Sequence, residues 1–291
     1  MKYGIFFAYW EKEWYSDYKK YIDKVAELGF DVLEIQCTAL RTTYTTNELL
    51  DDLKAYADEK KIMLTAGYGP TKEQNFSSSD PRVVESAMNY FKDLMPKLNR
   101  LGIKLLGGGL YSYWPVDFSL PIDKLGDWKR ASKNLKEIAK TAEEYQITLG
   151  LEVLNRYEGY LLNTCEEALG FVEEVNHPNV KVMLDTFHMN IEEDNIAQAI
   201  RLAGDKLCHL HLGEQNRKVP GKGSLPWNEI GCALRDIQYK GAAVMEPFVM
   251  QGGTIGEEIK VWRDLVPDVT EEKLDRDAKG ALEFVKQVFE K

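Results

Sequence analysis

Short apolar runs alternate along the chain with longer segments in which apolar residues recur every three or four positions. The longer segments predict amphipathic helices, as where Ala131, Leu135, Ile138 and Ala142 mark one face. The apolar runs predict buried strands at residues 3–9, 32–36, 63–68, 104–107, 148–152, 181–185, 207–212 and 242–246. Eight such alternations in 291 residues favour an α/β fold, a (β/α)8 TIM barrel, over an open doubly wound sheet.

The predicted helix starts agree with this pattern. Asp80, followed by proline, is typical of a helix N-cap, and Thr45 and Thr164 each precede a glutamate by three positions, as in a capping box. No linker or low-complexity segment divides the chain, and a last helix at about 271–289 would close the ring. We therefore expect a single barrel domain over residues 1–291.

Four side chains that can bind a metal stand at the ends of four predicted strands: Glu152, Asp185, His211 and Glu246. Any one of them alone could be a surface or capping residue. In a barrel, however, the carboxyl ends of consecutive strands surround one cavity. Charge at the rim of a buried strand is costly unless it is compensated. Three carboxylates and an imidazole would form an open site for a hard divalent cation.

Strand alternation separates the two histidines of the seventh predicted strand. His209 and His211 face the same side, one layer apart, so only His211 reaches the rim. We expect His209 to be a buried residue of the second layer rather than a ligand. Glu34, on the second strand, is expected to face inward and to join a hydrogen-bond network rather than to act in catalysis.

Composition limits the class of protein. With 44% hydrophobic and 29% charged residues the chain is typical of a soluble globular protein, and a net charge of −10 without a basic cluster argues against nucleic-acid binding. The four cysteines show no paired spacing, so we expect reduced thiols. The apolar start meets Glu11 at once, which predicts a first strand rather than a signal peptide. No stretch is long enough to span a membrane, and a cytoplasmic location is expected.

The segments around the four strand ends resemble one known family. LEVLNRYE, LDTFHMN, HLHLGEQNRKVPGKGSLPW and MEPF are similar to the corresponding segments of the D-tagatose 3-epimerase family, which includes the D-psicose (D-allulose) 3-epimerases. That family lies within the xylose-isomerase-like barrels. The resemblance extends from the YGIFFAYW start through the closing helix, and the HxHxGExNR…PGxG…PW string is its most specific part.

The resemblance implies roles for individual residues. It implies one cation per subunit, Mn²⁺ or Co²⁺ with Mg²⁺ as an alternative, bound by Glu152, Asp185, His211 and Glu246. It implies that Glu152 and Glu246 are also the catalytic acid and base. It further implies a substrate site that holds the carbonyl end of the sugar through Glu158, His188 and Arg217, and a wall around the far end of the sugar that includes Phe6, Trp14, Gly107 and Trp114.

The implied activity is inversion of C3 in a free ketohexose, such as D-fructose/D-psicose or D-tagatose/D-sorbose. One glutamate would remove the C3 proton to give a cis-enediolate, and the other would return a proton to the opposite face. The cation would stabilise the enediolate as a Lewis acid. The family resemblance also implies a homodimer or homotetramer whose partner molecule is a small ketose, with no nucleic acid and no membrane.

Other functions stay open at this point. A sugar isomerase of the same superfamily, similar to hydroxypyruvate or rhamnose isomerase, would use the same metal but convert a ketose into an aldose. An abasic-site endonuclease would need a histidine-rich zinc cluster and a basic face, which four histidines and a charge of −10 do not favour. A non-catalytic sugar-binding protein would not need two carboxylates around one metal. Residues 221–224 (GKGS) fail the Walker pattern and are interpreted as a barrel loop.

Overall fold

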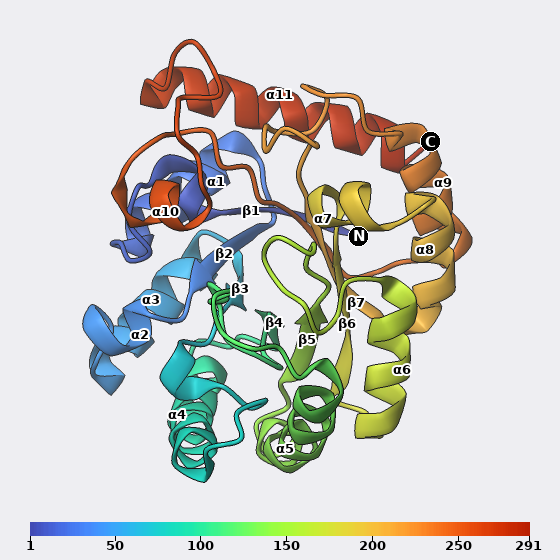
Figure 1. Ribbon diagram of the computed structural model, residues 1–291. Helices are drawn as coiled ribbons and strands as arrows, with labels where there is room; N and C mark the ends of the chain where they lie inside the picture. Colours follow the sequence, from blue (N-terminus) through green and yellow to red (C-terminus); the bar gives the residue numbers. More distant parts are fainter.

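Eight parallel strands pair in chain order and close on themselves (Figure 1). The computed structural model describes residues 1–291. The ring closes where β1 pairs with β8, with Lys2 opposite Ala242 and Ile5 opposite Met245. The strands are β1 Lys2–Phe6, β2 Val32–Gln36, β3 Met63–Gly67, β4 Leu105–Gly108, β5 Thr148–Glu152, β6 Val180–Asp185, β7 Leu207–Leu212 and β8 Ala242–Met245. The predicted single-domain (β/α)8 barrel is confirmed.

Helices surround the strands and complete the barrel (Figure 1). The helices are α1 Tyr18–Leu28, α2 Ala39–Thr42, α3 Asn47–Glu59, α4 Pro81–Arg100, α5 Lys124–Glu144, α6 Cys165–Val175, α7 Thr186–Glu192, α8 Ile196–Ala203, α9 Trp227–Asp236, α10 Gly253–Glu258 and α11 Glu271–Phe289, with short 3-10 helices η1 Phe7–Trp10, η2 Lys72–Gln74 and η3 Gly204–Lys206. The last helix, α11, packs against α9 and α1 and so closes the outer ring, as predicted. No helix is both long and apolar enough to cross a membrane.

Three strands have the predicted bounds (β2, β5 and β7), three others differ by one residue at one end (β3, β6 and β8), and β4 is shifted by one residue. The first strand was predicted too long, at 3–9. It ends at Phe6, and the chain then turns into η1, in which all four residues are buried. An unbroken apolar run does not distinguish a strand from a helical turn by its periodicity. Glu246 lies one residue beyond β8, outside the predicted strand 242–246.

Two of the three predicted helix starts are confirmed. The Asp80 side chain accepts from the backbone N–H of Arg82, and the Thr164 side chain accepts from that of Glu167. The reciprocal bond of the predicted capping box at Thr164 is absent, because Glu167 Oε2 accepts from the N–H of Asn163 instead. The capping box at Thr45 is wrong, because Thr46 is the N-cap of α3 and its hydroxyl accepts from the N–H of Leu49. Thr45 and Thr46 each carry a hydroxyl group that could cap the helix, and only the local backbone conformation decides which one does.

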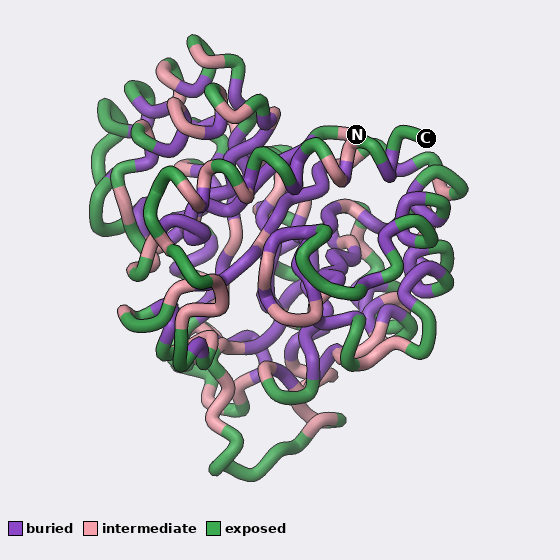
Figure 2. The backbone as a smooth tube through the Cα atoms, turned by 90° about the horizontal axis from the view of Figure 1, so that it is seen from above, coloured by how far each residue is buried: buried purple, intermediate pink, exposed green.

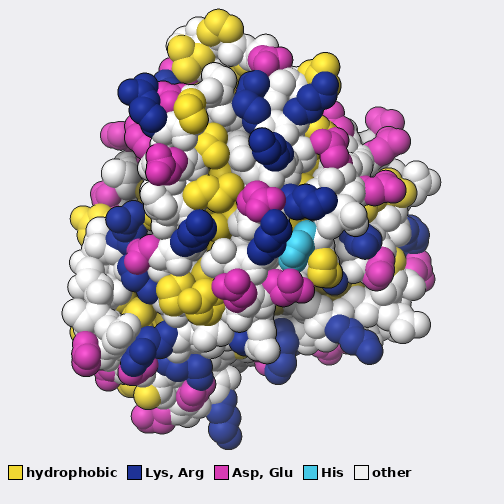
Figure 3. All heavy atoms as spheres, turned by 90° about the horizontal axis from the view of Figure 1, so that it is seen from below, with side chains coloured by type: hydrophobic (Ala, Val, Ile, Leu, Met, Phe, Trp, Pro, Cys, Tyr) yellow, Lys and Arg dark blue, Asp and Glu magenta, His cyan; other side chains and the backbone are white.

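The hydrophobic core fills the barrel and the layer between strands and helices. Figure 2 shows buried backbone through the middle of the molecule and exposed positions along loops and outer helix turns. Of the 291 residues, 117 are buried, and the few charged ones among them lie at or just beyond the strand ends, except Glu34 in the middle of β2. On the face seen in Figure 3, acidic and basic side chains are interspersed, and no continuous basic band crosses it.

Candidate functional site

The four predicted strand-end residues meet in one place. Asp185 ends β6, directly opposite His211 of β7, and Glu152 ends β5. His211 Nδ1 lies 3.4 Å from Glu152 Oε1, 3.8 Å from Asp185 Oδ2 and 3.3 Å from Glu246 Oε1. One ligand atom from each residue lies within 4.8 Å of the others. We call this group the acidic cage (Glu152, Asp185, His211 and Glu246).

The chemistry of the acidic cage fits a divalent cation. Asp185 Oδ1 accepts a hydrogen bond from the N–H of Phe187 and so caps α7, which leaves Oδ2 buried with no hydrogen-bond partner in the chain. His211 Nδ1 is also buried and has no hydrogen-bond partner. A buried polar atom without a partner is costly. A cation bound by these two atoms and by the two glutamates would satisfy all four residues.

Electrostatics in the acidic cage reflect crowded carboxylates. Burial raises the pKa of Glu246 to about 7, against the lowering effect of His211, and the charges of Glu152 and Asp185 add to the increase. Burial alone would lower the pKa of His211, but the Glu246 and Glu34 carboxylates raise it well above its ordinary value. Positive charge is therefore stabilised at the centre of the acidic cage, which is the environment a cation requires.

Arg217 connects the acidic cage to Glu158. Its Nη2 donates to Glu158 Oε1 over 2.7 Å, and its Nη1 lies 3.6 Å from Glu246 Oε2. The guanidinium lies 3.7 Å above the centre of the Phe187 ring, a cation–π contact that holds it flat. Burial alone would raise the pKa of Glu158, but Arg217 and His188 lower it overall. Arg217 Nη1 is buried and makes no hydrogen bond, so it is free to bind a ligand.

His188 offers a donor to the same cavity. Its Nδ1 faces two donors of Asn155, the backbone N–H at 3.3 Å and the side-chain amide at 2.7 Å. Because Nδ1 accepts, the ring proton of neutral His188 is on Nε2. His188, Glu158 and Arg217 all line the cavity above the acidic cage. The predicted substrate-binding trio is therefore brought together.

The cavity has a volume of about 350 Å³ and one aromatic wall. Phe6, Trp14 and Trp114 line it as predicted, with the Trp14 and Trp114 ring centres 5.9 Å apart. Gly107 does not line it, whereas Gly108 and Gly109 do; a Cβ on Gly107 would meet the sulfur of Met183, itself a lining residue, 2.5 Å away.

Several lining residues were not singled out from the sequence: Gln36, Tyr68, Phe248, Thr254 and Glu258. Phe248 could have been found, since it stands two residues after Glu246 in the segment MEPF. Gln36 ends β2, so its position at a strand end was a usable signal. Glu258 ends α10 and accepts from Trp14 Nε1 over 2.5 Å. No local pattern indicates that contact, because the two residues are 244 positions apart.

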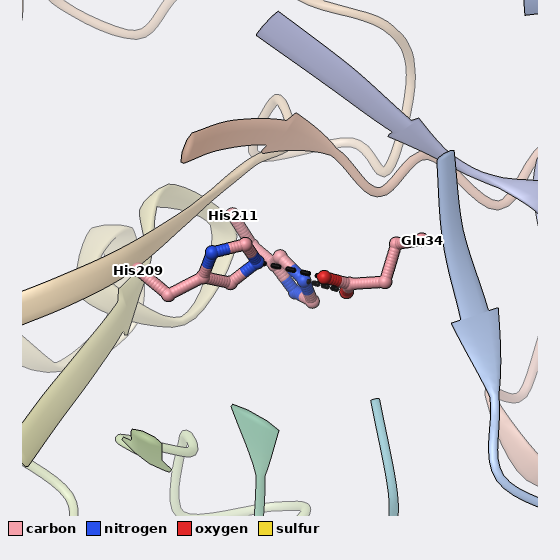
Figure 4. A group of neighbouring side chains, drawn as sticks. All are labelled: Glu34, His209 and His211. Carbon is pink, nitrogen blue, oxygen red and sulfur yellow. Dashed lines mark hydrogen bonds and ion pairs between the residues drawn. The ribbon is translucent and has the colours of Figure 1, made fainter. Parts of the chain in front are cut away.

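A second group of acidic and imidazole side chains lies beneath the acidic cage. Glu34 is buried between His209 and His211 and contacts both, as Figure 4 shows. Its Oε2 also accepts from the hydroxyl of Thr65 over 2.7 Å. The inward orientation of Glu34 and the second-layer position of His209 agree with the sequence analysis.

Comparison with known proteins identifies the family. Residues 22–265 match the model of the xylose isomerase-like TIM barrel family. The chain is 71% identical over 289 residues to a D-psicose 3-epimerase from Enterocloster bolteae, covering 99% of this chain and 96% of that protein. The chain belongs to the D-psicose/D-tagatose 3-epimerase family. The protein is thus an epimerase, and the predicted family and enzyme class are confirmed.

Other relatives agree with this assignment. A D-psicose 3-epimerase from Ruminiclostridium cellulolyticum is 54% identical over 290 residues, covering 100% of this chain and 98% of that protein. The crystal structure of a D-psicose 3-epimerase with D-tagatose, from Clostridium cellulolyticum H10, superimposes with a TM-score of 0.98 at 54% identity and covers 99% of both chains. A D-psicose 3-epimerase structure determined in the presence of D-fructose has a TM-score of 0.97 at 49% identity, again covering 99% of both chains.

Proposed function

We propose that this epimerase is a metal-dependent ketose 3-epimerase that inverts C3 of free ketohexoses such as D-fructose/D-psicose or D-tagatose/D-sorbose. The observation that carries the proposal is the position of two glutamates around one imidazole. Glu152 and Glu246 lie 3.4 and 3.3 Å from His211 Nδ1, at the floor of a cavity of about 350 Å³. Relatives named D-psicose 3-epimerase, and structures described with D-tagatose and D-fructose, support the substrate class.

The acidic cage would hold one divalent cation, Mn²⁺ or Co²⁺ with Mg²⁺ as an alternative, through Glu152, Asp185, His211 and Glu246. When bound there, the cation supplies Lewis-acid stabilisation of negative charge on the sugar oxygens, worth several kcal/mol. The donor set of three carboxylates and one imidazole supports a hard cation over a soft one.

Glu152 and Glu246 would transfer the protons. One carboxylate removes the proton from C3, next to the C2 carbonyl, and the other delivers a proton to the opposite face. Without a cation, burial raises the pKa of Glu246 to about 7; a bound cation would oppose this shift, because it favours the ionised carboxylate. General acid–base catalysis of this kind contributes about 10²–10⁴-fold in rate.

Arg217 and His188 would bind the oxygens on which negative charge develops. The Arg217 Nη1 group makes no hydrogen bond within the chain, and the Nε2–H of neutral His188 is directed away from its Asn155 contacts. Glu158, held by Arg217 over 2.7 Å, would use its other oxygen to accept a hydrogen bond from a hydroxyl group of the sugar. Donors that are already in place stabilise the transition state without a reorganisation cost.

The aromatic wall would cover the far end of the sugar. Phe6, Trp14 and Trp114 offer apolar faces there, while Glu13 and Glu258 add polar groups at the same end. Gly107 would contribute only through the backbone that leads to Gly108 and Gly109. A homodimer or homotetramer and a cytoplasmic location stay predictions from the sequence.

A panel of ketoses tests the proposal. Purified protein is incubated with Mn²⁺ and with each of D-fructose, D-psicose, D-tagatose and D-sorbose, with ketopentoses added for comparison, and the products are separated by chromatography. We expect the C3 epimer of at least one ketohexose as the sole product. An aldose product would indicate a sugar isomerase, and activity confined to ketopentoses would contradict the ketohexose assignment.

A further inference from the structure

We propose that Glu34 is a positioning residue for the acidic cage: it binds the Nε2–H of His211 and thereby directs the Nδ1 lone pair at the cation site. The proposal rests on the proposed function, since it assumes that the acidic cage holds a cation. Glu34 does not contact the cavity and has no place in the proton transfer described above. Its effect would pass through His211 alone.

Glu34 reaches His211 across the interior of the barrel. It lies on β2 and His211 on β7, strands that are not neighbours in the closed sheet. His211 Nε2 and Glu34 Oε1 are 2.5 Å apart, and both side chains are almost completely buried, with 3% and 1% exposed. In Figure 4 the carboxylate of Glu34 points directly at the imidazoles of His211 and His209. A short contact between buried groups fixes the plane of the His211 ring.

The direction of this hydrogen bond decides which nitrogen of His211 can bind a cation. An ionised carboxylate only accepts hydrogen bonds, so the Nε2 that faces Glu34 carries the proton. An imidazole that binds a cation is neutral and carries one proton, so with this proton on Nε2 the lone pair is on Nδ1. Nδ1 is the atom that lies 3.3 to 3.8 Å from the three carboxylates of the acidic cage.

Without Glu34 the proton has an alternative position. Glu246 and Glu152 lie 3.3 and 3.4 Å from Nδ1 and would accept a hydrogen bond from Nδ1–H. A protonated Nδ1 cannot be a ligand. Glu34 competes with these two carboxylates for the proton of the ring, and in doing so it preserves the fourth ligand.

The other oxygen of Glu34 is held separately. Oε2 accepts from Thr65 Oγ1 over 2.7 Å and lies 2.8 Å from His209 Nε2. These two contacts fix the side-chain conformation of Glu34 without touching the acidic cage. Oε1 of Glu34 therefore contacts the proposed metal ligand His211, and the contacts of Oε2 hold the Glu34 side chain in place. Thr65, which contacts only Oε2, offers a matched control.

The experiment compares Glu34→Met with Thr65→Val by their affinity for Mn²⁺. Methionine has a similar size but no strong acceptor, and valine removes only the support at Oε2. Binding of Mn²⁺ to protein stripped of metal is followed by the electron paramagnetic resonance of the free ion. The Mn²⁺ affinities are compared at alkaline pH, where they no longer change with pH, so that proton binding by the ligands does not affect the comparison. We expect Glu34→Met to weaken binding about 10–100-fold, and Thr65→Val to weaken it less.

A spectroscopic measurement separates positioning from a merely structural role. Pulsed electron paramagnetic resonance of bound Mn²⁺ detects a directly coordinated ¹⁴N nucleus, and His211 is the one nitrogen ligand of the acidic cage. We expect this ¹⁴N coupling in the unmodified protein and its loss or weakening in Glu34→Met. A structural role alone would lower the melting temperature and leave the affinity and the coupling of the folded molecules unchanged.

The outcomes distinguish this proposal from the function itself. A folded Glu34→Met protein with unchanged Mn²⁺ affinity and ¹⁴N coupling would overturn the role of Glu34 and leave the acidic cage intact. Absence of the ¹⁴N coupling from the unmodified protein would overturn both. If Glu34→Met does not fold, Glu34→Gln decides, because it keeps the shape and leaves only a neutral, weaker acceptor that competes poorly with Glu152 and Glu246 for the ring proton; unchanged affinity and coupling there would also contradict the proposal.

Discussion

Arg217 donates a hydrogen bond to Glu158 over 2.7 Å, although the two residues stand on different loops, 59 positions apart. The pair is mostly buried, with 7% of the arginine and 17% of the glutamate side chain exposed. Its second guanidinium nitrogen faces Glu246 at 3.6 Å. The Arg217 guanidinium thus connects Glu158 of the substrate-binding trio to Glu246 of the acidic cage.

Substitution of either proposed proton-transfer glutamate should abolish turnover. Glu152→Gln and Glu246→Gln keep the side-chain shape but remove the base, and we expect kcat to fall by at least about 10²-fold. Product formation from D-psicose or D-fructose measures the effect. Circular dichroism and Mn²⁺ binding serve as controls, since both residues also belong to the acidic cage. Epimerisation by either variant at the unmodified rate would falsify the two-base assignment.

Removal of divalent cations should remove activity and lower stability. Treatment with EDTA, followed by gel filtration, is expected to give inactive protein, and added Mn²⁺ or Co²⁺ should restore turnover. A cation at 100 times its Kd stabilises the folded state by about 2.7 kcal/mol, which thermal unfolding detects. Full activity in protein whose metal content lies below detection would contradict a metal-dependent mechanism.

Loss of Arg217 should affect both binding and turnover. Arg217→Ala removes the donor and leaves Glu158 buried without its partner, so we expect kcat/KM to fall by about 10²–10³-fold. Arg156 provides a matched control: it also pairs with a glutamate, Glu192, but it is exposed and does not line the cavity. Arg156→Ala should leave kcat/KM nearly unchanged. Equal losses of kcat/KM in the two variants would contradict a specific role of Arg217 in the cavity.

Stability at acid pH should depend on Glu158. Its pKa in the folded protein is lowered by Arg217 and His188 below the ordinary value of 4.5, despite the opposing effect of burial. The stability it contributes is therefore fully present above pH 4.5 and is lost as the pH falls through the lower, folded-state pKa. As the pH falls through this range, we expect the free energy of unfolding to decrease less steeply in Glu158→Gln than in the unmodified protein, as measured by urea denaturation. An unchanged slope would contradict the prediction.

The contact between Glu258 and Trp14 should influence substrate affinity. Glu258→Ala removes the acceptor of the Trp14 indole N–H, and one side of the aromatic wall loses its connection to α10. We expect KM to rise more for ketohexoses than for ketopentoses, because the additional carbon of a ketohexose would extend toward the wall, with a smaller change in kcat. The neighbouring exposed Glu257 supplies the control, as Glu257→Ala. A uniform loss of kcat for both sugar lengths would argue against this role.

Much of the fold was predictable because it depends on local pattern. Short apolar runs separated by amphipathic segments gave the strand order, and the bounds of β5 and β7 were predicted to the residue. The acidic cage was predictable for the same reason, since Glu152 and Asp185 end consecutive strands and His211 is the last residue but one of the next strand. Errors arose where the pattern was ambiguous, as in the aromatic run after Phe6 and in the choice between Thr45 and Thr46.

The sequence by itself determined the barrel, the identity of the acidic cage and the separation of His211 from His209, because strand alternation and strand ends are properties of a few neighbouring residues. Only the tertiary structure decided what lies around them. Glu34 meets His209 and His211 from 175 and 177 positions away. Gly108 and Gly109, rather than Gly107, line the cavity. Such contacts depend on the closure of the sheet, which brings together side chains that no local periodicity relates.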